Sequence, residues 1–300
     1  MKRMALVFLL LACSAAAIAG GKGQPAGPRV PPGVEFLPDV VYGKAGEREL
    51  RLDIARPEKH APGKLPVLVY IHGGGWRGGS RKTGANFPFA ARGYFGVSIE
   101  YRLSGEATWP AQVHDCKAAI RWLRANAAKY NLDTDHIGVW GHSAGGHLAA
   151  LIGTSGDVPE LEGKNGSPGF STKVAAVVDC FGPTDFLAMV DRPSRIDRHG
   201  AQCPEALLLG KPLRDVPDLV RQANPIIYVD AKDPPFLILH GDQDDVVPFN
   251  QSELLHAALQ KAGVPSTFRP VKGAGHGGPG FETPEVRGWI SEFFDRHLRK

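Results

Sequence analysis

Residues 137–145 read Ile137-Gly138-Val139-Trp140-Gly141-His142-Ser143-Ala144-Gly145. The apolar run at 137–140 predicts a buried strand, and the helix-forming residues around 148–151 predict a helix soon after it. The GxSxG pattern therefore falls on a sharp turn from strand to helix, where small residues two positions before and after the serine avoid clashes. Such a turn lifts the hydroxyl of Ser143 above the edge of the sheet, which predicts that this serine is a nucleophile.

Strand and helix patterns alternate on both sides of this turn. Several strand patterns are continuously apolar, as in Val67-Leu68-Val69-Tyr70-Ile71, and this is typical of parallel strands that are covered on both faces. We therefore expect an α/β fold with a mostly parallel central sheet of about eight strands and helices on both faces. The predicted strands are 49–55, 66–71, 95–100, 136–140, 174–180, 236–240 and 266–271, and the predicted helices are 111–130, 144–152, 250–262 and 284–298.

An acid should follow the serine in the chain. A serine hydroxyl needs a base to take its proton, the base needs an acid to orient it, and with this turn the chain order is Ser, Asp or Glu, His. The predicted strand 236–240 is followed by Asp242, Asp244 and Asp245, and we choose Asp244 as the orienting acid. Asp242 and Asp245 are expected to bond loop amides or to face solvent. Asp185, after the preceding strand, is the rival acid.

Three histidines follow Asp244, and their contexts differ. His256 lies inside a predicted helix and His297 lies in the charged terminal helix, where a solvated imidazole is the ordinary interpretation. His276 lies after the last predicted strand, in a glycine-rich loop at 272–278 that can bring the ring over the serine. We predict that His276 is the base.

The run His72-Gly73-Gly74-Gly75-Trp76 directly follows the predicted strand 66–71. Glycines at such a place let backbone amides approach a developing oxyanion with no Cβ in the way. We predict an oxyanion hole made by the amides of Gly74 and Gly75, with Ala144 as the third donor. A phosphate-binding glycine loop is the alternative, but no Walker lysine and serine pattern and no GxGxxG opening follows.

Loops beyond the carboxyl ends of parallel strands usually hold the ligand. In these loops, Trp76, Tyr101, Arg102 and Trp109 are expected to line the rim of the site, and the three aromatic residues are our candidates for substrate contact. Arg102 and Asp115 are expected to form a structural pair. The stretch 185–230 lies over the predicted site without a clear pattern, so we expect it to be a lid or a specificity insertion.

Two further histidines flank the nucleophile. His142 and His147 precede the acid in the chain, and packing or orienting roles are the interpretation that we favour for them. Together with His72 they give three histidines, which is enough ligands for a metal site, but their spacing matches no zinc pattern. We therefore predict no metal and no cofactor.

The amino-terminal residues are typical of a secretory signal. Lys2 and Arg3 precede an apolar block at 4–11, which is about half of the roughly 20 residues needed to cross a bilayer. We expect a signal peptide at 1–19 in an exported protein with no stable membrane span. A lipoprotein signal is the alternative, with a lipid anchor at Cys13. After the signal we expect a Gly/Pro-rich tether at 20–33 and one catalytic domain at 34–300.

Charge and cysteine content limit the partners and the cross-links. Loss of the signal removes two basic residues and no acids, so the net charge of +4 becomes +2, and basic and acidic residues are interleaved. Neither feature favours a nucleic-acid partner. Cys116, inside a predicted helix, is expected to be a buried thiol. Our hypothesis for Cys180 and Cys203 is a disulfide, because an exported protein permits one.

Four motifs together resemble the α/β-hydrolase superfamily over residues 35–300: HGGGW at 72–76, GHSAGG at 141–146, HGDQDDVVP at 240–248 and GAGHGG at 273–278. HGGG with SAGG is similar to the hormone-sensitive-lipase type of carboxylesterase, which usually has an acid at the position of His142. Trp76 and His142 look more like the bifunctional deacetylase/feruloyl esterase (BD-FAE) group, whose members act on plant polysaccharides, and also like kynurenine formamidases.

Together with the expected signal peptide, the resemblance implies an exported serine carboxylic-ester hydrolase that removes acetyl or feruloyl groups from a carbohydrate through an acyl-enzyme. The implied partner is a small ester or an acylated carbohydrate. One alternative is a general short-chain carboxylesterase or lipase, which chain-length preference would separate. The other alternative is a non-catalytic binding module with the hydrolase fold.

Overall fold

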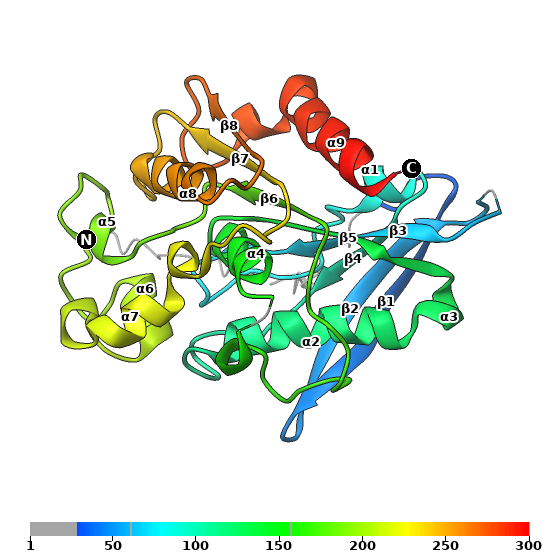
Figure 1. Cartoon of the computed structure of the whole chain (residues 1–300), viewed down its shortest axis with the longest axis horizontal. Helices are drawn as coiled ribbons and strands as arrows, with labels where there is room; N and C mark the ends of the chain where they lie inside the picture. Colours follow the sequence, from blue (N-terminus) through cyan, green and yellow to red (C-terminus); the bar gives the residue numbers. More distant parts are fainter. Residues whose placement is uncertain (1–28, 61, 157, 300) are drawn as a thin grey trace, which may run out of the picture.

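A computed structural model describes residues 29–60, 62–156 and 158–299 of the chain. These residues form an eight-stranded sheet in the order β1-β2-β4-β3-β5-β6-β7-β8 (Figure 1). Strands β4, β3 and β5 to β8 pair in parallel, whereas β1 and β2 form an antiparallel edge, so the predicted α/β class is confirmed. The strands are β1 (Val34–Ala45), β2 (Arg48–Pro57), β3 (Leu65–Ile71), β4 (Phe95–Ile99), β5 (Leu132–His142), β6 (Ala176–Cys180), β7 (Phe236–Gly241) and β8 (Ser266–Val271).

The edge strand β1 is the strand that the sequence analysis missed. Its pairing with β2 is interrupted by register shifts between Leu37 and Val40 and between Val41 and Gly43. Each shift changes the face of the sheet to which the following residues point. The alternation of apolar and polar residues that marks a strand therefore does not continue along β1. The seven strands that the sequence predicts are present, with differences at their ends.

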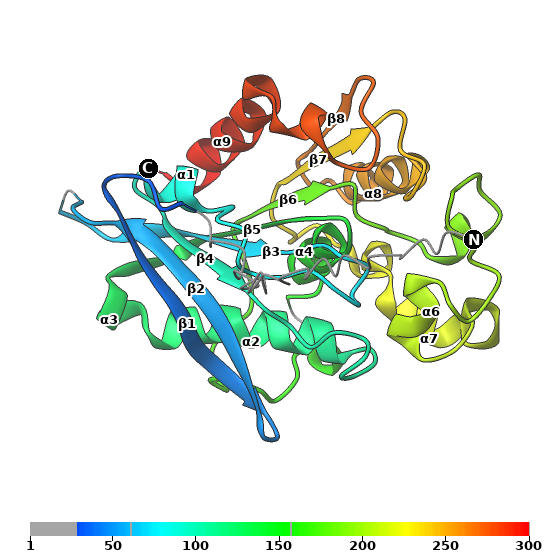
Figure 2. The same ribbon diagram turned by 180° about the vertical axis from the view of Figure 1, so that it is seen from behind.

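Helices cover both faces of the sheet. Figures 1 and 2, seen from opposite sides, place α2 (Ala111–Ala125) and α4 (Ala144–Thr154) on one face and α9 (Pro284–Leu298) on the other. The predicted helix 111–130 is divided at Asn126, after which the chain makes one further turn. The remaining α-helices outside the β6–β7 region are α1 (Phe87–Ala90), α3 (Ala127–Tyr130) and α8 (Asn250–Lys261), among the residues described.

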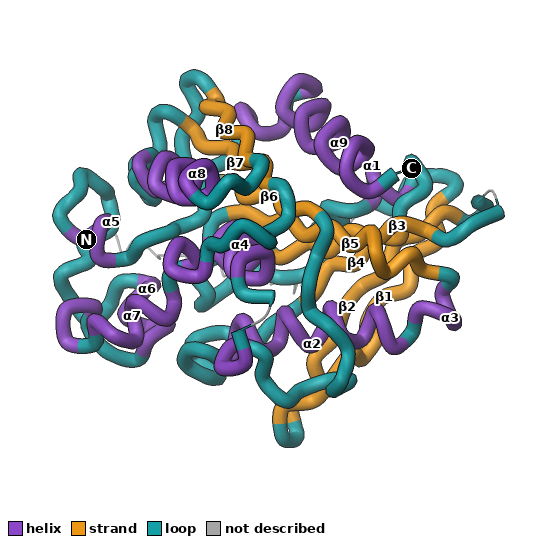
Figure 3. The backbone as a smooth tube through the Cα atoms, viewed as in Figure 1, coloured by secondary structure: helices purple, strands orange, loops and turns teal. Residues whose placement is uncertain are grey.

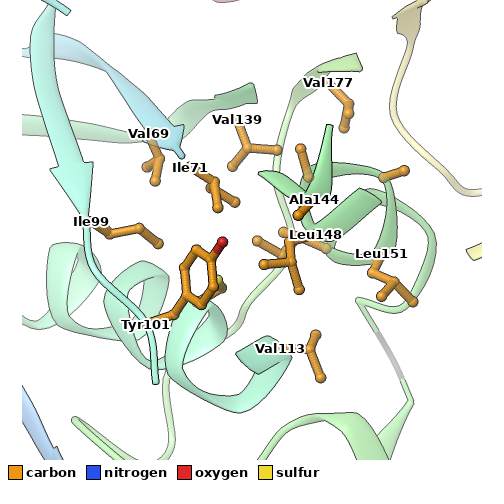
Figure 4. Packing of buried hydrophobic residues seen from close by; sticks show 14 of the residues in the cluster. Val69, Ile71, Ile99, Tyr101, Val113, Val139, Ala144, Leu148, Leu151 and Val177 are labelled. Carbon is orange, nitrogen blue, oxygen red and sulfur yellow. The ribbon is translucent and has the colours of Figure 1, made fainter. Parts of the chain in front are cut away.

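Strand β3 explains why the central strands are apolar at every position. Val69 packs with Leu148 of α4 in the cluster shown in Figure 4, whereas Leu68 packs with Phe294 of α9 on the opposite face. All four side chains are buried. Each buried side chain of this size contributes about 1.5–3 kcal/mol to the free energy of unfolding, so both faces favour apolar residues.

Residues 181–235, which we call the β6–β7 connection, are the least regular part of the domain. Their short helices are α5 (Leu187–Val190), α6 (Pro204–Leu209) and α7 (Pro217–Ala223), which gather at one end of the molecule, on the left in Figure 1. Figure 3 shows the loop between α5 and α6. The connection begins at the carboxyl end of β6, next to the strand that carries Ser143, and it contains the predicted insertion 185–230.

The three cysteines of the described residues are free thiols. Cys116 is buried, as predicted. The predicted disulfide between Cys180 and Cys203 is wrong, because Cys180 belongs to the hydrophobic cluster under α9 and Cys203 belongs to the cluster on the other side of the sheet. The Sγ atom of Cys203 instead accepts a hydrogen bond from the amide of Ala206 at 3.4 Å and caps α6.

The expectations for the amino terminus fall largely outside the described part of the chain. The predicted signal peptide at 1–19, the proposed lipid anchor at Cys13 and residues 20–28 of the tether lie there. Within the described ranges, no helix has the length and apolar character that crossing a membrane requires.

Candidate active site

The turn between β5 and α4 holds Ser143 in a strained conformation. Its backbone has φ 54° and ψ −122°, a region that L residues rarely adopt, and its amide donates to the carbonyl oxygen of Cys180 at 2.9 Å. A Cβ on Gly145 would lie 2.1 Å from the carbonyl oxygen of Ile71, and one on Gly141 would lie 2.4 Å from the carbonyl oxygen of Gly145. The glycines of GxSxG are therefore required by the close approach of this turn to β3.

Three side chains from three strand ends form one hydrogen-bonded chain. The Nε2 atom of His276 lies 2.8 Å from Oγ of Ser143, and its Nδ1 atom lies 2.7 Å from Oδ2 of Asp244. The loop after β8 carries His276, and the loop after β7 carries Asp244. The structure thus brings together the three residues that the sequence analysis singled out, although they are far apart in the chain.

The carboxylate of Asp244 is well supplied with donors. Its Oδ1 atom accepts from the amides of Val246 and Val247 at 2.8 and 2.9 Å, and its Oδ2 atom faces Nε2 of His240 at 3.2 Å. Burial alone would raise the pKa of Asp244, but the hydrogen bonds from His240 and His276, the nearby His276 ring and the Val246 amide together hold it well below its usual value. Asp244 is therefore an anion at neutral pH.

The buried ring of His240 is a supporting residue that the sequence analysis missed. Its Nδ1 atom lies 2.7 Å from Oγ of Ser252, and its Nε2 atom faces both Asp244 and the carbonyl oxygen of Val247. Because both of the latter partners are acceptors, Nε2 carries the proton and donates. The first residue of the HGDQDDVVP motif was the available signal for this role.

The rival acids occupy other places. The Oδ1 atom of Asp242 accepts from the amide of Gly273 at 2.7 Å and ties two loops together, and the side chain of Asp245 is exposed. Asp185 accepts from Asn224 at 3.2 Å within the β6–β7 connection. The amide-bonding and solvent-facing roles expected for the two neighbours of Asp244 agree with these contacts.

The glycine run after β3 lies against the serine turn. A Cβ on Gly73 would lie 3.4 Å from the Cβ of Ser143, and a Cβ on Gly74, at φ +117°, would lie 2.4 Å from the carbonyl oxygen of Gly78. Within the described residues, no protein acceptor is found for the amides of Gly74, Gly75 or Ala144. All three amides are therefore available as donors beside the serine.

The histidines that flank the nucleophile are packed against other groups. His142 stacks on Phe181 and lies 3.1 Å from the hydroxyl of Tyr70, and burial lowers its pKa to about 4. His147 lies 2.7 Å from the carbonyl oxygen of Ala223, and burial lowers its pKa to about 4 as well. Both rings are neutral at neutral pH and have packing roles.

A cavity of about 370 Å³ opens above Ser143. One side comes from strand ends, with Ser143, His276 and the glycine run. The other side comes largely from the β6–β7 connection, and sequence reasoning identified none of the individual residues there. Beyond the catalytic candidates, the lining residues are Trp76, Arg77, Phe181, Pro183, Ile196, Arg198, Pro204, Glu205, Val246 and Val247.

Two of the three predicted substrate contacts require correction. Tyr101 and Trp109 are buried in the core and do not line this cavity. The hydroxyl of Tyr101 donates to the carbonyl oxygen of His72 at 2.9 Å, and its ring lies among the packed residues of Figure 4. The backbone amide of Trp109 donates to the carbonyl oxygen of Leu208 in α6 at 2.8 Å. Trp76 does line the cavity.

Arg102 and Asp115 form the predicted pair, with Nε of Arg102 2.7 Å from Oδ2 of Asp115. Across the described ranges, no group of three or more His, Cys, Asp and Glu side chains is arranged to hold a metal ion.

Comparison with known proteins identifies the family to which this chain is similar. The family model for BD-FAE matches residues 52–259. Esterase LipQ of Mycobacterium tuberculosis is 38% identical over 232 residues, which are 75% of this chain and 53% of LipQ. Esterase LipC of the same organism is 34% identical over 242 residues, 79% of this chain and 59% of LipC. The chain thus spans little more than half the length of these curated relatives.

Solved structures agree with the family match. A truncated carbohydrate esterase from gut microbiota is 36% identical, with a TM-score of 0.80 over 89% of this chain and 97% of that one. The propionate-bound esterase Est2 of Thermogutta terrifontis is 29% identical, with a TM-score of 0.71 over 90% of this chain and 97% of that one. The motifs, the sheet order and these matches agree, and the chain belongs to the BD-FAE family of the α/β-hydrolase fold.

Proposed function

We propose that this protein is a serine esterase that hydrolyses carboxylic esters through an acyl-enzyme. The observation that carries the proposal is the continuous hydrogen-bonded chain from Asp244 through His276 to Ser143, which lines a cavity. The esterase names of the curated relatives support the same reaction.

In the proposed mechanism, His276 Nε2 takes the proton of Ser143 as Oγ attacks the ester carbonyl carbon. The amides of Gly74, Gly75 and Ala144 stabilise the negative charge that develops on the carbonyl oxygen. His276 then gives its proton to the leaving alcohol, and the same ring activates the water that releases the acid. Asp244 remains ionised and holds the Nδ1 proton of the ring throughout.

The test is the variant Ser143→Ala, assayed with p-nitrophenyl acetate. Loss of the nucleophile should lower kcat by at least about four orders of magnitude, because the remaining groups cannot form the acyl-enzyme. Labelling of the wild-type protein, but not of the variant, by a fluorophosphonate probe checks the same residue independently. Unchanged hydrolysis by Ser143→Ala would refute the assignment, and an unreactive wild-type protein would instead favour a non-catalytic binding module.

We further propose an acylated carbohydrate, bearing acetyl or feruloyl groups, as the substrate. The family match and the carbohydrate-esterase description of a similar structure support this choice. A general short-chain carboxylesterase is the second candidate, favoured by the propionate and butyrate named with Est2. Parallel assays of acetylated xylan, methyl ferulate and p-nitrophenyl esters of increasing chain length separate the two.

Export is also a proposal, and it rests on the amino-terminal sequence alone. Amino-terminal sequencing of the protein recovered from its native host tests the idea. A mature chain that begins at Gly20 would agree with cleavage after Ala19. A lipid-modified chain that begins at Cys13 would favour the anchored alternative, and an intact Met1 in all of the protein would refute export by either route.

A further inference from the structure

The candidate base His276 lies in a loop whose backbone does little to fix the orientation of its ring. Gly275 and Gly277 flank it, and Gly277 has positive φ. Glycine has more conformational freedom than any other residue, so the shape of such a loop depends on its contacts. Hydrogen bonds to Ser143 and Asp244 fix the two nitrogens of the ring. The tilt of the ring about the line through these nitrogens depends on the groups that pack against it.

The ring of Phe181 packs against the ring of His276. The two ring centroids lie 4.8 Å apart, and the ring planes are inclined by 64°. Phe181 is buried, and His142 stacks on it with a centroid distance of 5.5 Å. Phe281 makes a T-shaped contact with the same ring at 4.6 Å. These neighbours hold the ring of Phe181 in place, so it offers His276 a fixed surface.

A strained backbone at the end of β6 places this ring. Phe181 directly follows β6, and its φ of 47° lies in the left-handed region, which bulky residues rarely adopt. Its amide donates to the carbonyl oxygen of Leu239 in β7 at 2.7 Å, and the amide of Gly182 donates to Oδ1 of Asp179 at 2.9 Å. Such a conformation costs free energy and is found most often at functional sites. The strain indicates that the position of the Phe181 side chain matters.

The end of β6 contacts both the nucleophile and the base. In the sheet, β6 lies between β5, which leads to Ser143, and β7 (Figure 1). The carbonyl oxygen of Cys180 accepts from the amide of Ser143 at 2.9 Å, and the ring of the next residue, Phe181, contacts His276. One short segment thus holds the turn of the nucleophile through its backbone and the ring of the base through a side chain.

We propose that Phe181 is a positioning residue for His276, whose ring fixes the tilt of the imidazole so that both nitrogens stay aligned with Ser143 and Asp244. The inference rests on the proposed esterase function and adds to it a residue that acts through the base. Proton transfer requires the reacting atoms to be aligned within hydrogen-bond reach, and a misplacement of about 1 Å can cost about 100-fold in rate. Loss of the Phe181 ring should therefore lower kcat and leave KM nearly unchanged.

The variant Phe181→Met tests the proposal. Methionine keeps the position apolar and fills an irregular space, but its flexible chain presents no flat surface to the imidazole. The backbone cost of positive φ remains, because methionine is also an L residue with a Cβ. We expect kcat for p-nitrophenyl acetate to fall by at least about tenfold with little change in KM. Each kcat is expressed per serine labelled by a fluorophosphonate probe at completion, so that unfolded protein does not count.

The variant Phe293→Met is the matched control. Phe293 lies in α9 and belongs to the same hydrophobic cluster as Phe181, but it does not line the cavity. The exchange removes the same kind of ring from the same cluster, so it reproduces the loss of packing without the loss of the contact to His276. The control should keep the kcat of the wild-type protein.

A second measurement follows the ring of His276 itself. The proton between His276 and Asp244 should give a separate downfield signal in NMR spectra, which is assigned by its loss in His276→Gln. In Phe181→Met this proton should exchange with water faster than in the wild-type protein at the same pH and temperature. The physical reason is that a ring free to tilt opens the hydrogen bond more often. Phe293→Met should leave the exchange rate unchanged.

The outcomes separate the inference from the function on which it rests. Wild-type kcat and exchange rate in Phe181→Met overturn the role of Phe181, and so does a rise in KM at unchanged kcat, since the ring would then contact the substrate instead. If neither Phe181→Met nor Phe181→Leu folds while the control does, the role is structural and the proposal is also overturned. A wild-type protein that neither hydrolyses the ester nor reacts with the probe overturns the proposed function and the inference together.

Discussion

The two walls of the cavity are built in different ways. The wall made by strand ends carries Ser143 and His276 on turns whose shape depends on glycines and on backbone contacts to the sheet. The wall made by the β6–β7 connection carries Arg198 and Glu205 on short segments held by side-chain contacts. The comparison indicates that the geometry of the sheet positions Ser143 and His276, whereas the facing wall is formed by a segment that the sheet does not constrain.

The two walls also differ in the buried carboxylate that each contains. Asp244 has donors on both oxygens and serves the histidine that it orients. Glu205 lines the cavity, and its Oε1 atom accepts from Nε of Arg198 at 3.0 Å. A fully paired acid such as Asp244 fits a fixed role in every turnover.

The largest effect should come from the wall of strand ends. The variant Asp244→Asn keeps the shape of the side chain but removes the charge that holds the proton on Nδ1 of His276. We expect kcat for p-nitrophenyl acetate to fall by about 10⁴-fold with little change in KM. Steady-state kinetics measure kcat and KM of the variant. A fall in kcat of less than tenfold would contradict the orienting role of Asp244 in the wall of strand ends.

The next effect concerns the folding of the second wall. Arg198→Met leaves Glu205 as a buried carboxylate with no charged partner, which should lower the free energy of unfolding by about 3–5 kcal/mol. The double variant Arg198→Met/Glu205→Leu should recover most of this loss, since both charges are gone. Urea unfolding monitored by fluorescence compares them. A single variant as stable as the wild-type protein would contradict the importance of the pair.

A smaller effect is expected at the glycine run. A Cβ at Gly74 would lie 2.4 Å from the carbonyl oxygen of Gly78 and would displace the amides beside Ser143. We expect Gly74→Ala to lower kcat roughly 100-fold, as for loss of one oxyanion donor. Gly46→Ala is the control, because Gly46 also has positive φ but no atom near its Cβ position. Equal kcat values for the two variants would argue against this oxyanion assignment.

The smallest effect is expected from His147, which links the two walls. His147, on α4, bonds the carbonyl oxygen of Ala223 in the β6–β7 connection, and burial lowers its pKa to about 4. The unfolded chain binds a proton below about pH 6.5, whereas the folded protein does not until about pH 4. The contribution of neutral His147 to the free energy of unfolding is therefore fully present above pH 6.5 and falls as the pH approaches 4. The loss at pH 5 is about 2 kcal/mol.

The measurement compares wild-type protein and His147→Gln by urea unfolding at pH 8 and pH 5. The comparison is needed because burial raises the pKa of Asp179 to about 6, and a raised carboxyl pKa favours the folded protein in acid. Both proteins contain Asp179, so its effect cancels in the difference. Equal losses on acidification in the two proteins would contradict the role given to His147.

Local patterns were sufficient for much of the fold and for the order of the candidate catalytic residues. Continuous apolar runs mark strands that are buried on both faces, and polar residues at their ends mark the loops that meet at one edge. The same reasoning missed β1, because its bulges remove the period on which a strand prediction depends. It also placed Tyr101 and Trp109 at the rim, since nothing in a loop's own residues shows which way its side chains turn.

The amino-acid sequence by itself determined the parallel sheet, the strained turn at Ser143 and the likeness to an esterase, because these depend on short-range patterns and on where glycine is required. The tertiary structure alone decided that Cys180 and Cys203 lie on opposite sides of the sheet and that Arg198 and Glu205 meet in the cavity wall. Such contacts depend on how an irregular segment folds back over the sheet, and the energy of packing that segment is spread over residues distant in the chain.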